Sequence, residues 1–236
     1  MKEPVKHFKK PKDAKTIIPD RNKKKQRVKT AKYRKISSTN WLKRQLNDPY
    51  VDKAVKLGVR GRAYFKIEEI DNKFKVIKKG GSIIDLGCAP GGWLQYSVKS
   101  KAKFVLGIDI LETTPVEGAV IIQQDFLTEN AVEKILSKMP DNKKADSVIS
   151  DLAANTTGHK ATDHMKTTML VEKAYSFAKQ VLNEDGCFVA KLFRGGAEDK
   201  LLNQLKKDFK IVKHFKPESS RRDSVEMYVI ATGFKG

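Results

Sequence analysis

Residues 83–93 read IIDLGCAPGGW, a short apolar run that passes through a glycine-rich turn into a helical pattern. Such a run predicts a buried strand, and Gly87, Gly91 and Gly92 allow the backbone to turn tightly and approach a ligand closely. The turn does not fit the dinucleotide fingerprint G-x-G-x-x-G, because it contains Pro90 and spaces its glycines differently. The stretch therefore predicts a site for a nucleoside without phosphates, recognised by its base, ribose and amino-acid tail.

Other short β-rich runs alternate with helical patterns along the chain. The runs are SIIDLG (82–87), KFVLGIDI (103–110), GAVIIQQDF (118–126), DSVISDLA (146–153), GCFVAKLF (186–193), FKIVKHF (209–215) and SVEMYVIATGF (224–234), and the helical patterns cover 129–138, 163–183 and 197–208. Alternating strands and helices predict a parallel, doubly wound α/β sheet. The last two runs have no helix between them and should pair antiparallel. The expected fold is that of a class I methyltransferase: Rossmann-like, with a mostly parallel seven-stranded sheet, a C-terminal antiparallel hairpin and helices on both faces.

The N-terminal part of the chain differs in composition from the rest. Residues 1–35 contain 15 Lys/Arg against 3 Asp/Glu, with few large apolar residues, so they cannot bury enough surface to fold alone. Apolar spacing then predicts one helix over 41–57 and a second over 62–77. The sequence therefore predicts a basic, flexible arm over 1–37 and a methyltransferase domain over 38–236.

The overall charge narrows the class of partner. The chain of 236 residues has a formal net charge of +20, which favours binding to a polyanion such as RNA, DNA or anionic lipid. General solubility is the alternative reading, and charge alone does not separate the two. Two cysteines suit a reducing compartment better than a disulfide scaffold, and we find no secretory signal and no apolar run of membrane-spanning length. We expect a soluble, cytoplasmic monomer.

Acidic residues recur where the predicted strands end. Asp85, Asp109 and Asp125 close three consecutive strands, at the edge where open α/β sheets bind ligands. Asp109 has the spacing of a group that binds ribose hydroxyls, and Asp125 could accept a hydrogen bond from an adenine amino group. Together the three acids favour S-adenosylmethionine as cofactor. Trp93 could line the pocket, and ordinary packing at the start of a helix is the alternative. His159 and His164 have no partners at metal-ligand spacing, so no metal is predicted.

A single lysine interrupts a strand that is otherwise apolar. Lys191 lies within GCFVAKLF, and a buried strand rarely contains an ammonium group. Its position points to chemistry rather than to a solvated surface. Lys66, Asp151 and Glu226, taken singly, are more often ordinary surface or turn residues.

Five blocks of the sequence resemble the RrmJ/FtsJ family of ribose 2'-O-methyltransferases. They are RGRAYFKIEEID (60–71), DLGCAPGGW (85–93), SDLAAN (150–155), VAKLFRGG (189–196) and KPESSRRDSVEMYVIATG (216–233). The resemblance covers the chain from about residue 38 onward, and it is strongest to the bacterial enzymes that methylate a uridine in the A-loop of large-subunit rRNA.

The resemblance implies a set of site residues. The family's Lys-Asp-Lys-Glu catalytic tetrad falls on Lys66, Asp151, Lys191 and Glu226, and its cofactor contacts fall on Gly91, Trp93, Asp109, Asp125 and Asp151. Lys191 would be the general base for the ribose hydroxyl. The chain departs from the family pattern at Ala154, where proline is common, and at Val225, where arginine is common.

The resemblance also implies the partners: S-adenosylmethionine and the 23S rRNA of the large ribosomal subunit. A tRNA or cap ribose is the alternative substrate, and a non-catalytic RNA-binding assembly factor is the alternative class of protein. Arg221 and Arg222 could bind RNA phosphates, and Arg60 and Arg62 could extend the same basic track.

Overall fold

The computed structural model describes residues 27–28, 30, 32, 35–154, 157–193, 199–221 and 223–236. The chain divides into two compact units, Met1–Leu57 and Gly58–Gly236. Most of the predicted basic arm lies outside the described residues. The predicted boundary between residues 37 and 38 stays a prediction.

The first unit contains two helices where the sequence pattern predicted one. They are α1 (Ile36–Leu46) and α2 (Pro49–Leu57), so the prediction of a single helix over 41–57 was wrong. Proline disfavours helical geometry in the residue before it, and Pro49 is the first residue of α2. Asp48 Oδ1 accepts the main-chain N–H of Tyr50 at 3.0 Å, which caps the new helix.

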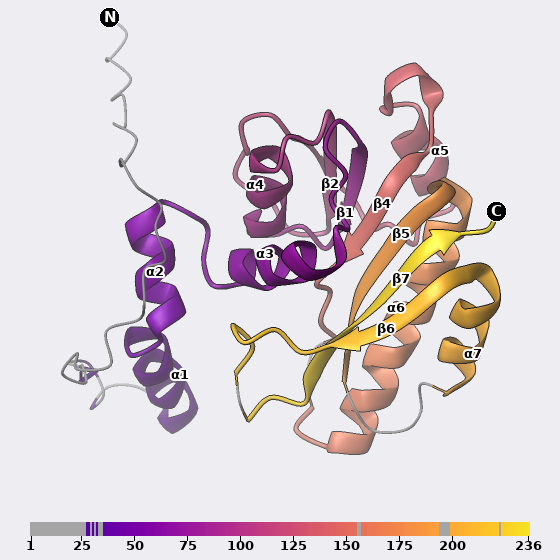
Figure 1. Ribbon diagram of the computed structural model, residues 1–236. Helices are drawn as coiled ribbons and strands as arrows, with labels where there is room; N and C mark the ends of the chain where they lie inside the picture. The colour runs from indigo at the N-terminus through magenta and orange to yellow at the C-terminus, as the bar shows by residue number, and fades with distance from the viewer. Residues whose placement is uncertain are drawn as a thin grey trace, which may run out of the picture. The chain divides into compact units, whose positions relative to one another are not determined.

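The second unit is an α/β domain (Figure 1). Its elements are α3 (Ala63–Phe74), β1 (Ser82–Leu86), α4 (Gly92–Lys99), β2 (Phe104–Asp109), β3 (Val120–Gln123), α5 (Ala131–Leu136), the short 3-10 helix η2 (Pro140–Asn142), β4 (Ala145–Ser150), α6 (Lys160–Val181), β5 (Leu182–Phe193), α7 (Asp199–Asp208), β6 (Phe209–Phe215) and β7 (Glu226–Phe234). The predicted helix over 62–77 ends earlier, at Phe74, because Lys75 takes a left-handed conformation (φ 55°).

All seven strands form one sheet in the order β3-β2-β1-β4-β5-β7-β6. The first five strands in this order pair parallel, whereas β7 pairs antiparallel with both β5 and β6. The predicted parallel sheet with a C-terminal antiparallel hairpin is therefore confirmed.

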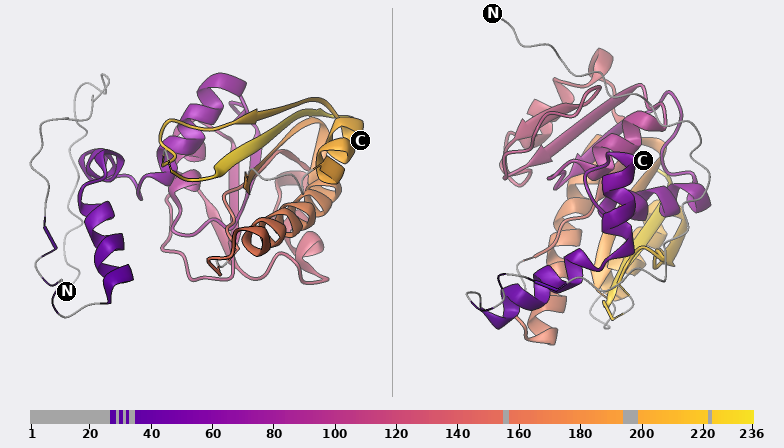
Figure 2. Two further views of the ribbon diagram at one scale, coloured as in Figure 1. Left: turned by 90° about the horizontal axis from the view of Figure 1, so that it is seen from below. Right: turned by 90° about the vertical axis from the view of Figure 1, so that its left-hand side faces the viewer.

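Helices cover both faces of the sheet, with α3 and α4 on one side and α5, α6 and α7 on the other (Figures 1 and 2). Successive side chains of a strand point to opposite faces, so each central strand contributes to two apolar layers. The layer against α5, α6 and α7 includes Ile84, Leu86, Leu106, Ile108, Val148, Phe188 and Val229.

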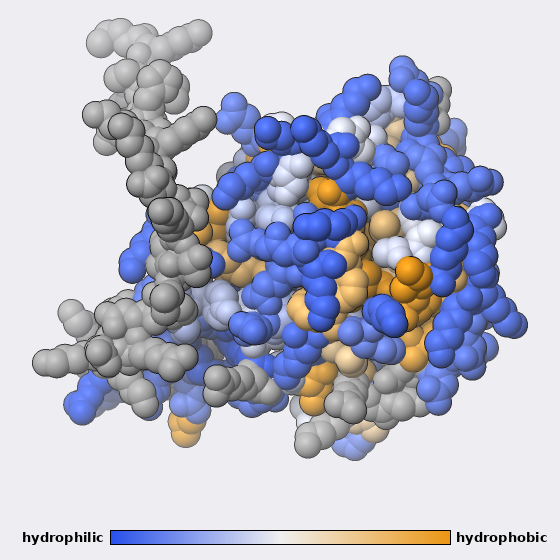
Figure 3. Space-filling view, viewed as in Figure 1, coloured by the Kyte–Doolittle hydropathy of each residue, from blue (hydrophilic) through white to orange (hydrophobic). Residues whose placement is uncertain are grey.

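On the face shown in Figure 3, hydrophilic side chains cover most of the surface and apolar ones form small patches. Within the described part of the chain, each helix is too short or too polar to cross a membrane.

The apolar layers account for much of the stability, and Phe188 tests this directly. Phe188 is 0% exposed in β5, and its ring centroid lies 5.9 Å from that of Tyr175 on α6. We expect Phe188→Ala to lower the free energy of unfolding by about 3–5 kcal/mol in urea titrations, because the surrounding side chains cannot fill the cavity. Ile211→Ala, at a position 53% exposed in β6, should change it by less than about 0.5 kcal/mol. Equal losses for the two variants would contradict this account of the core.

Candidate active site

The candidate site lies at the edge of the sheet where the parallel strands end. Asp109 is the last residue of β2, and Asp151 directly follows β4. Because β7 runs antiparallel to β5, its first residue, Glu226, pairs in register with Phe193, the last residue of β5. Side chains from strands of both directions therefore meet at this edge.

Lys191 lies two residues before the end of β5, directly opposite Tyr228 of β7. The lysine is 7% exposed. Its Nζ lies 3.0 Å from Asp151 Oδ1 and donates a hydrogen bond of 2.7 Å to the main-chain oxygen of Asp151. The lysine that interrupts the apolar strand is therefore buried and paired with a carboxylate.

Lys66 reaches the same point from α3, on one face of the sheet. It is 8% exposed, and its Nζ lies 2.9 Å from Glu226 Oε1 and 3.5 Å from Asp151 Oδ2. The four residues of the predicted tetrad thus form one cluster, in which two ammonium groups face two carboxylates. Asp151 is the shared member, since it contacts both lysines.

Electrostatic contacts set the ionisation of Asp151. Burial acts to raise the pKa of Asp151, but the charges of Lys191 and Lys66, with hydrogen bonds from Tyr228 and Lys191, outweigh it and hold the pKa below its ordinary value. Asp151 is therefore a carboxylate at neutral pH.

Tyr228 belongs to the same cluster, although the sequence pattern did not single it out. Its hydroxyl donates to Asp151 Oδ1 at 2.6 Å, and Lys66 Nζ lies 5.7 Å from the centroid of its ring. Burial raises the pKa of Tyr228 well above its ordinary value, and the negative charges of Asp151 and Glu226 add to this, so the phenol stays protonated and donates. The available signal was strand alternation, which places a residue two positions after Glu226 on the same face.

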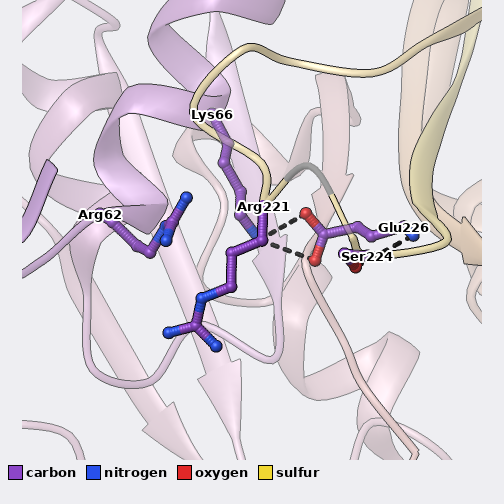
Figure 4. Close-up of a pocket in the computed structure, with 5 residues that line it drawn as sticks. All are labelled: Arg62, Lys66, Arg221, Ser224 and Glu226. Atoms are coloured by element: carbon purple, nitrogen blue, oxygen red, sulfur yellow. Dashed lines mark hydrogen bonds and ion pairs between the residues drawn. The ribbon is translucent and has the colours of Figure 1, made fainter. Parts of the chain in front are cut away.

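A pocket of about 230 Å³ opens beside the tetrad and is lined by Arg62, Lys66, Arg221, Ser224 and Glu226 (Figure 4). Arg62 and Arg221 bring two further positive charges to it. The loop before β7 also fixes Glu226, since Ser220 Oγ donates to Glu226 Oε1 at 2.8 Å and Ser224 Oγ accepts the Glu226 N–H at 3.1 Å. Arg222, predicted to bind phosphate, lies outside the described residues.

The glycine-rich turn lies at the same sheet edge, between β1 and α4. Gly91 has φ 101°, which favours glycine, and it precedes the first residue of α4. Gly87 also favours glycine, because its φ is 75° and a Cβ there would come within 2.2 Å of Leu152 Cδ2. Asp109 stabilises the conformation of the turn, because its Oδ2 accepts the Ala89 N–H at 2.8 Å.

The other predicted cofactor residues lie near this turn or at the same edge. The Trp93 indole is buried and donates from Nε1 to the main-chain oxygen of Ala63 at 2.9 Å, so the indole N–H is used in packing. Asp125 is exposed just beyond β3, and its Oδ1 accepts the Leu127 N–H at 2.9 Å. Their contacts with a cofactor stay predictions.

Asp85 is buried beneath the turn. It is 1% exposed, and its Oδ2 has no hydrogen-bond partner among the described residues. Burial, with the negative charges of Asp151 and Asp109, raises the pKa of Asp85 well above its ordinary value. A buried carboxyl with an unsatisfied oxygen suits a ligand that carries a hydrogen-bond donor.

Across the described ranges, no group of three or more His, Cys, Asp or Glu residues is placed to hold a metal ion.

Comparison with known proteins identifies the family. Residues 59–234 match the model described as FtsJ-like methyltransferase. This chain belongs to that family. It is 52% identical to a ribosomal RNA large subunit methyltransferase E of Parvibaculum lavamentivorans, over 89% of this chain and 87% of the relative. A protein of the same name from Rickettsia akari is 51% identical, over 89% of this chain and 94% of the relative.

A solved structure from Plasmodium falciparum, described as a ribosomal RNA methyltransferase, has the same FtsJ-like methyltransferase fold. It superposes with a TM-score of 0.68 at 31% identity, covering 75% of this chain and 99% of the other. The predicted fold and family are confirmed, and the chain is a methyltransferase.

The buried Asp85 makes a specific prediction for stability. Its raised pKa means that the folded state holds the proton more tightly than the unfolded chain does, so its contribution to stability is present at low pH and is lost as pH rises through the folded-state pKa. Asp85→Asn removes this loss. Urea unfolding should therefore show the variant gaining stability over the wild type as pH rises from about 4 to 8.

Asp125→Asn is the matched control for loss of one strand-end acidic group at an exposed position. If the stability curves of the wild type and Asp85→Asn run parallel across this pH range, the assignment of a raised pKa to the buried Asp85 carboxyl is wrong.

Proposed function

We propose that this protein transfers a methyl group from S-adenosylmethionine to the ribose 2'-hydroxyl of a uridine in the A-loop of 23S rRNA, acting on the assembled large ribosomal subunit. The observation that carries the proposal is the buried cluster of Lys66, Asp151, Lys191 and Glu226 beside a basic pocket. Relatives about 50% identical and named ribosomal RNA large subunit methyltransferase E support the choice of RNA.

The chain's own residues fit S-adenosylmethionine, which carries a positive charge next to the methyl group that it supplies. The turn at Gly91 allows close backbone approach, and the acids at this edge match a cationic nucleoside. In the proposal, Asp109 binds the ribose hydroxyls, Asp125 the adenine, and Asp151 the methionine end. Trp93 contributes its main-chain N–H from the first turn of α4, where helix N–H groups lack partners within the helix. Gly91, whose own N–H donates to Cys88 O at 2.6 Å, contributes the close backbone approach.

In the proposal, each of the four tetrad residues has a different role at the ribose 2'-oxygen that accepts the methyl group. Lys191 first releases its own ammonium proton to solvent, and its neutral Nζ then accepts the proton of the ribose 2'-hydroxyl, which makes the oxygen a stronger nucleophile. Asp151 holds Lys191 in place through two contacts, at 3.0 Å from the side chain and 2.7 Å from the main chain. Lys66, held by Glu226 at 2.9 Å, supplies positive charge beside the oxygen while negative charge develops on it.

The substrate enters, in this proposal, over the basic pocket. Arg62 and Arg221 contact phosphates that flank the target ribose, and the basic arm over 1–37 adds sequence-independent phosphate contacts. RNA affinity then falls steeply with salt. We place the protein in the cytoplasm, as a monomer on the large subunit.

The test is methyl transfer from labelled S-adenosylmethionine by the wild type and by Lys191→Ala. The substrates are large subunits that lack the modification, naked large-subunit rRNA and bulk tRNA, with the product mapped to nucleotide and atom. We expect transfer to one 2'-oxygen of the large subunit, and a loss of about 10²–10⁴-fold in Lys191→Ala, the usual contribution of a general base.

Lys206→Ala, at an exposed position on α7, is the matched control and should keep wild-type activity. Lys191→Ala leaves Asp151 with one fewer cation, so its melting temperature and its calorimetric affinity for S-adenosylmethionine are measured in parallel. Transfer to tRNA alone would overturn the rRNA assignment and keep the chemistry. Cofactor and RNA binding by the wild type without transfer to any substrate would favour an RNA-binding assembly factor.

A further inference from the structure

Arg60 makes an unusual set of contacts just before α3. Its Nη1 donates to the main-chain oxygens of Pro90 and Thr114, at 3.0 and 2.5 Å, and its Nη2 donates to the main-chain oxygen of Pro115 at 2.5 Å. Its own N–H donates to Gln95 Oε1 at 2.8 Å. One guanidinium therefore joins two loops that are distant in sequence. Gln95 of α4 holds the main chain of Arg60 through the hydrogen bond to its N–H.

Both loops belong to the sheet edge where the cofactor residues lie. Pro90 is part of the glycine-rich turn, and residues 110–119 join β2 to β3 directly after Asp109. The packing around Arg60 is close, since a Cβ on Gly91 would lie 2.7 Å from Arg60 Nη1. Asp109 also holds this turn, because its carboxylate accepts the Ala89 N–H.

We propose that Arg60 is a positioning residue for the cofactor, which braces the glycine-rich turn against the 110–119 loop. This inference rests on the proposed function, because it takes S-adenosylmethionine as the ligand of the turn. A loop segment without the hydrogen bonds of a helix or sheet opens easily, and ordering it around a ligand consumes part of the binding free energy. A brace that holds the turn closed before the ligand arrives removes part of that cost.

The shape of the guanidinium suits this role. Its planar fork presents several N–H groups in fixed directions, so Nη1 and Nη2 can serve carbonyls of two segments at once. A lysine has one ammonium and cannot span them in the same way. The sequence pattern predicts that Arg60, with Arg62, belongs to a basic track that binds RNA phosphates. The contacts instead direct the Arg60 side chain at main-chain carbonyls of the cofactor loops.

The experiment separates cofactor binding from RNA binding. Calorimetry with S-adenosylmethionine alone and filter binding with a large-subunit rRNA fragment alone are run on the wild type, Arg60→Gln, Arg60→Lys and Arg62→Gln. We expect Arg60→Gln to bind S-adenosylmethionine about tenfold more weakly or worse, since it loses charge-assisted hydrogen bonds, and to keep its RNA affinity within about twofold. Arg60→Lys should be intermediate, and Arg62→Gln, at the basic pocket, should show the reverse pattern.

Two further readouts test positioning rather than folding. Amide hydrogen exchange at Ala89 and Gly91, without any ligand, should be faster in Arg60→Gln, and steady-state kinetics should show a raised KM for S-adenosylmethionine with kcat little changed. If Arg60→Gln melts below the assay temperature, Gln95→Leu takes its place, because it releases the Arg60 backbone and leaves the guanidinium in the chain.

The outcomes are distinct. Weaker cofactor binding with RNA binding retained supports the brace. Unchanged cofactor affinity in Arg60→Gln overturns it, whether or not RNA affinity falls, and a fall in RNA affinity alone would make Arg60 a phosphate contact. A wild type that does not bind S-adenosylmethionine would overturn the proposed cofactor and the brace together.

Discussion

The ion pairs between Lys66, Asp151, Lys191 and Glu226 are the constraint on which the rest of the site depends. Burying an ammonium group without a partner costs several kcal/mol, roughly the scale of a domain's whole stability. Each lysine here is offset by a carboxylate about 3 Å away. Because Asp151 contacts both lysines, loss of one member leaves another uncompensated. The same contacts join α3, the end of β4, β5 and β7. The ion pairs that position the predicted catalytic groups therefore also stabilise the local fold.

The antiparallel strand β7 makes this cluster possible. In a parallel sheet every strand presents its carboxyl end at the ligand edge, and the amino ends lie on the opposite side. By entering between β5 and β6 in the reverse direction, β7 brings its first residue, Glu226, to that edge. Tyr228 follows on the same face and reaches Asp151. A plain dinucleotide-binding sheet has no equivalent strand, and its edge would lack both groups.

Most of the fold could be predicted from the sequence, because strand and helix periods are local properties of the chain. The glycine-rich turn, the β-rich runs and the absence of a helix before β7 were sufficient for the sheet and its hairpin. Family motifs predicted the four residues that the structure brings into one cluster. The break between α1 and α2 was missed although Pro49 was visible, since the apolar spacing continued across it. The importance of Tyr228 was missed because aromatic residues are ordinary in strands.

The sequence by itself determined the class of protein: an α/β methyltransferase with a buried lysine, acids at its strand ends and a strongly basic composition. Only the tertiary structure decided which groups meet. The local sequence pattern indicates that Lys191 is buried. It does not indicate that the Asp151 carboxylate contacts Lys191, Lys66 and the Tyr228 hydroxyl at the same time. The same pattern does not indicate that the Arg60 guanidinium donates to main-chain carbonyls rather than to solvent. Side-chain partners depend on distances between segments far apart in the chain, and those distances exist only after the sheet has formed.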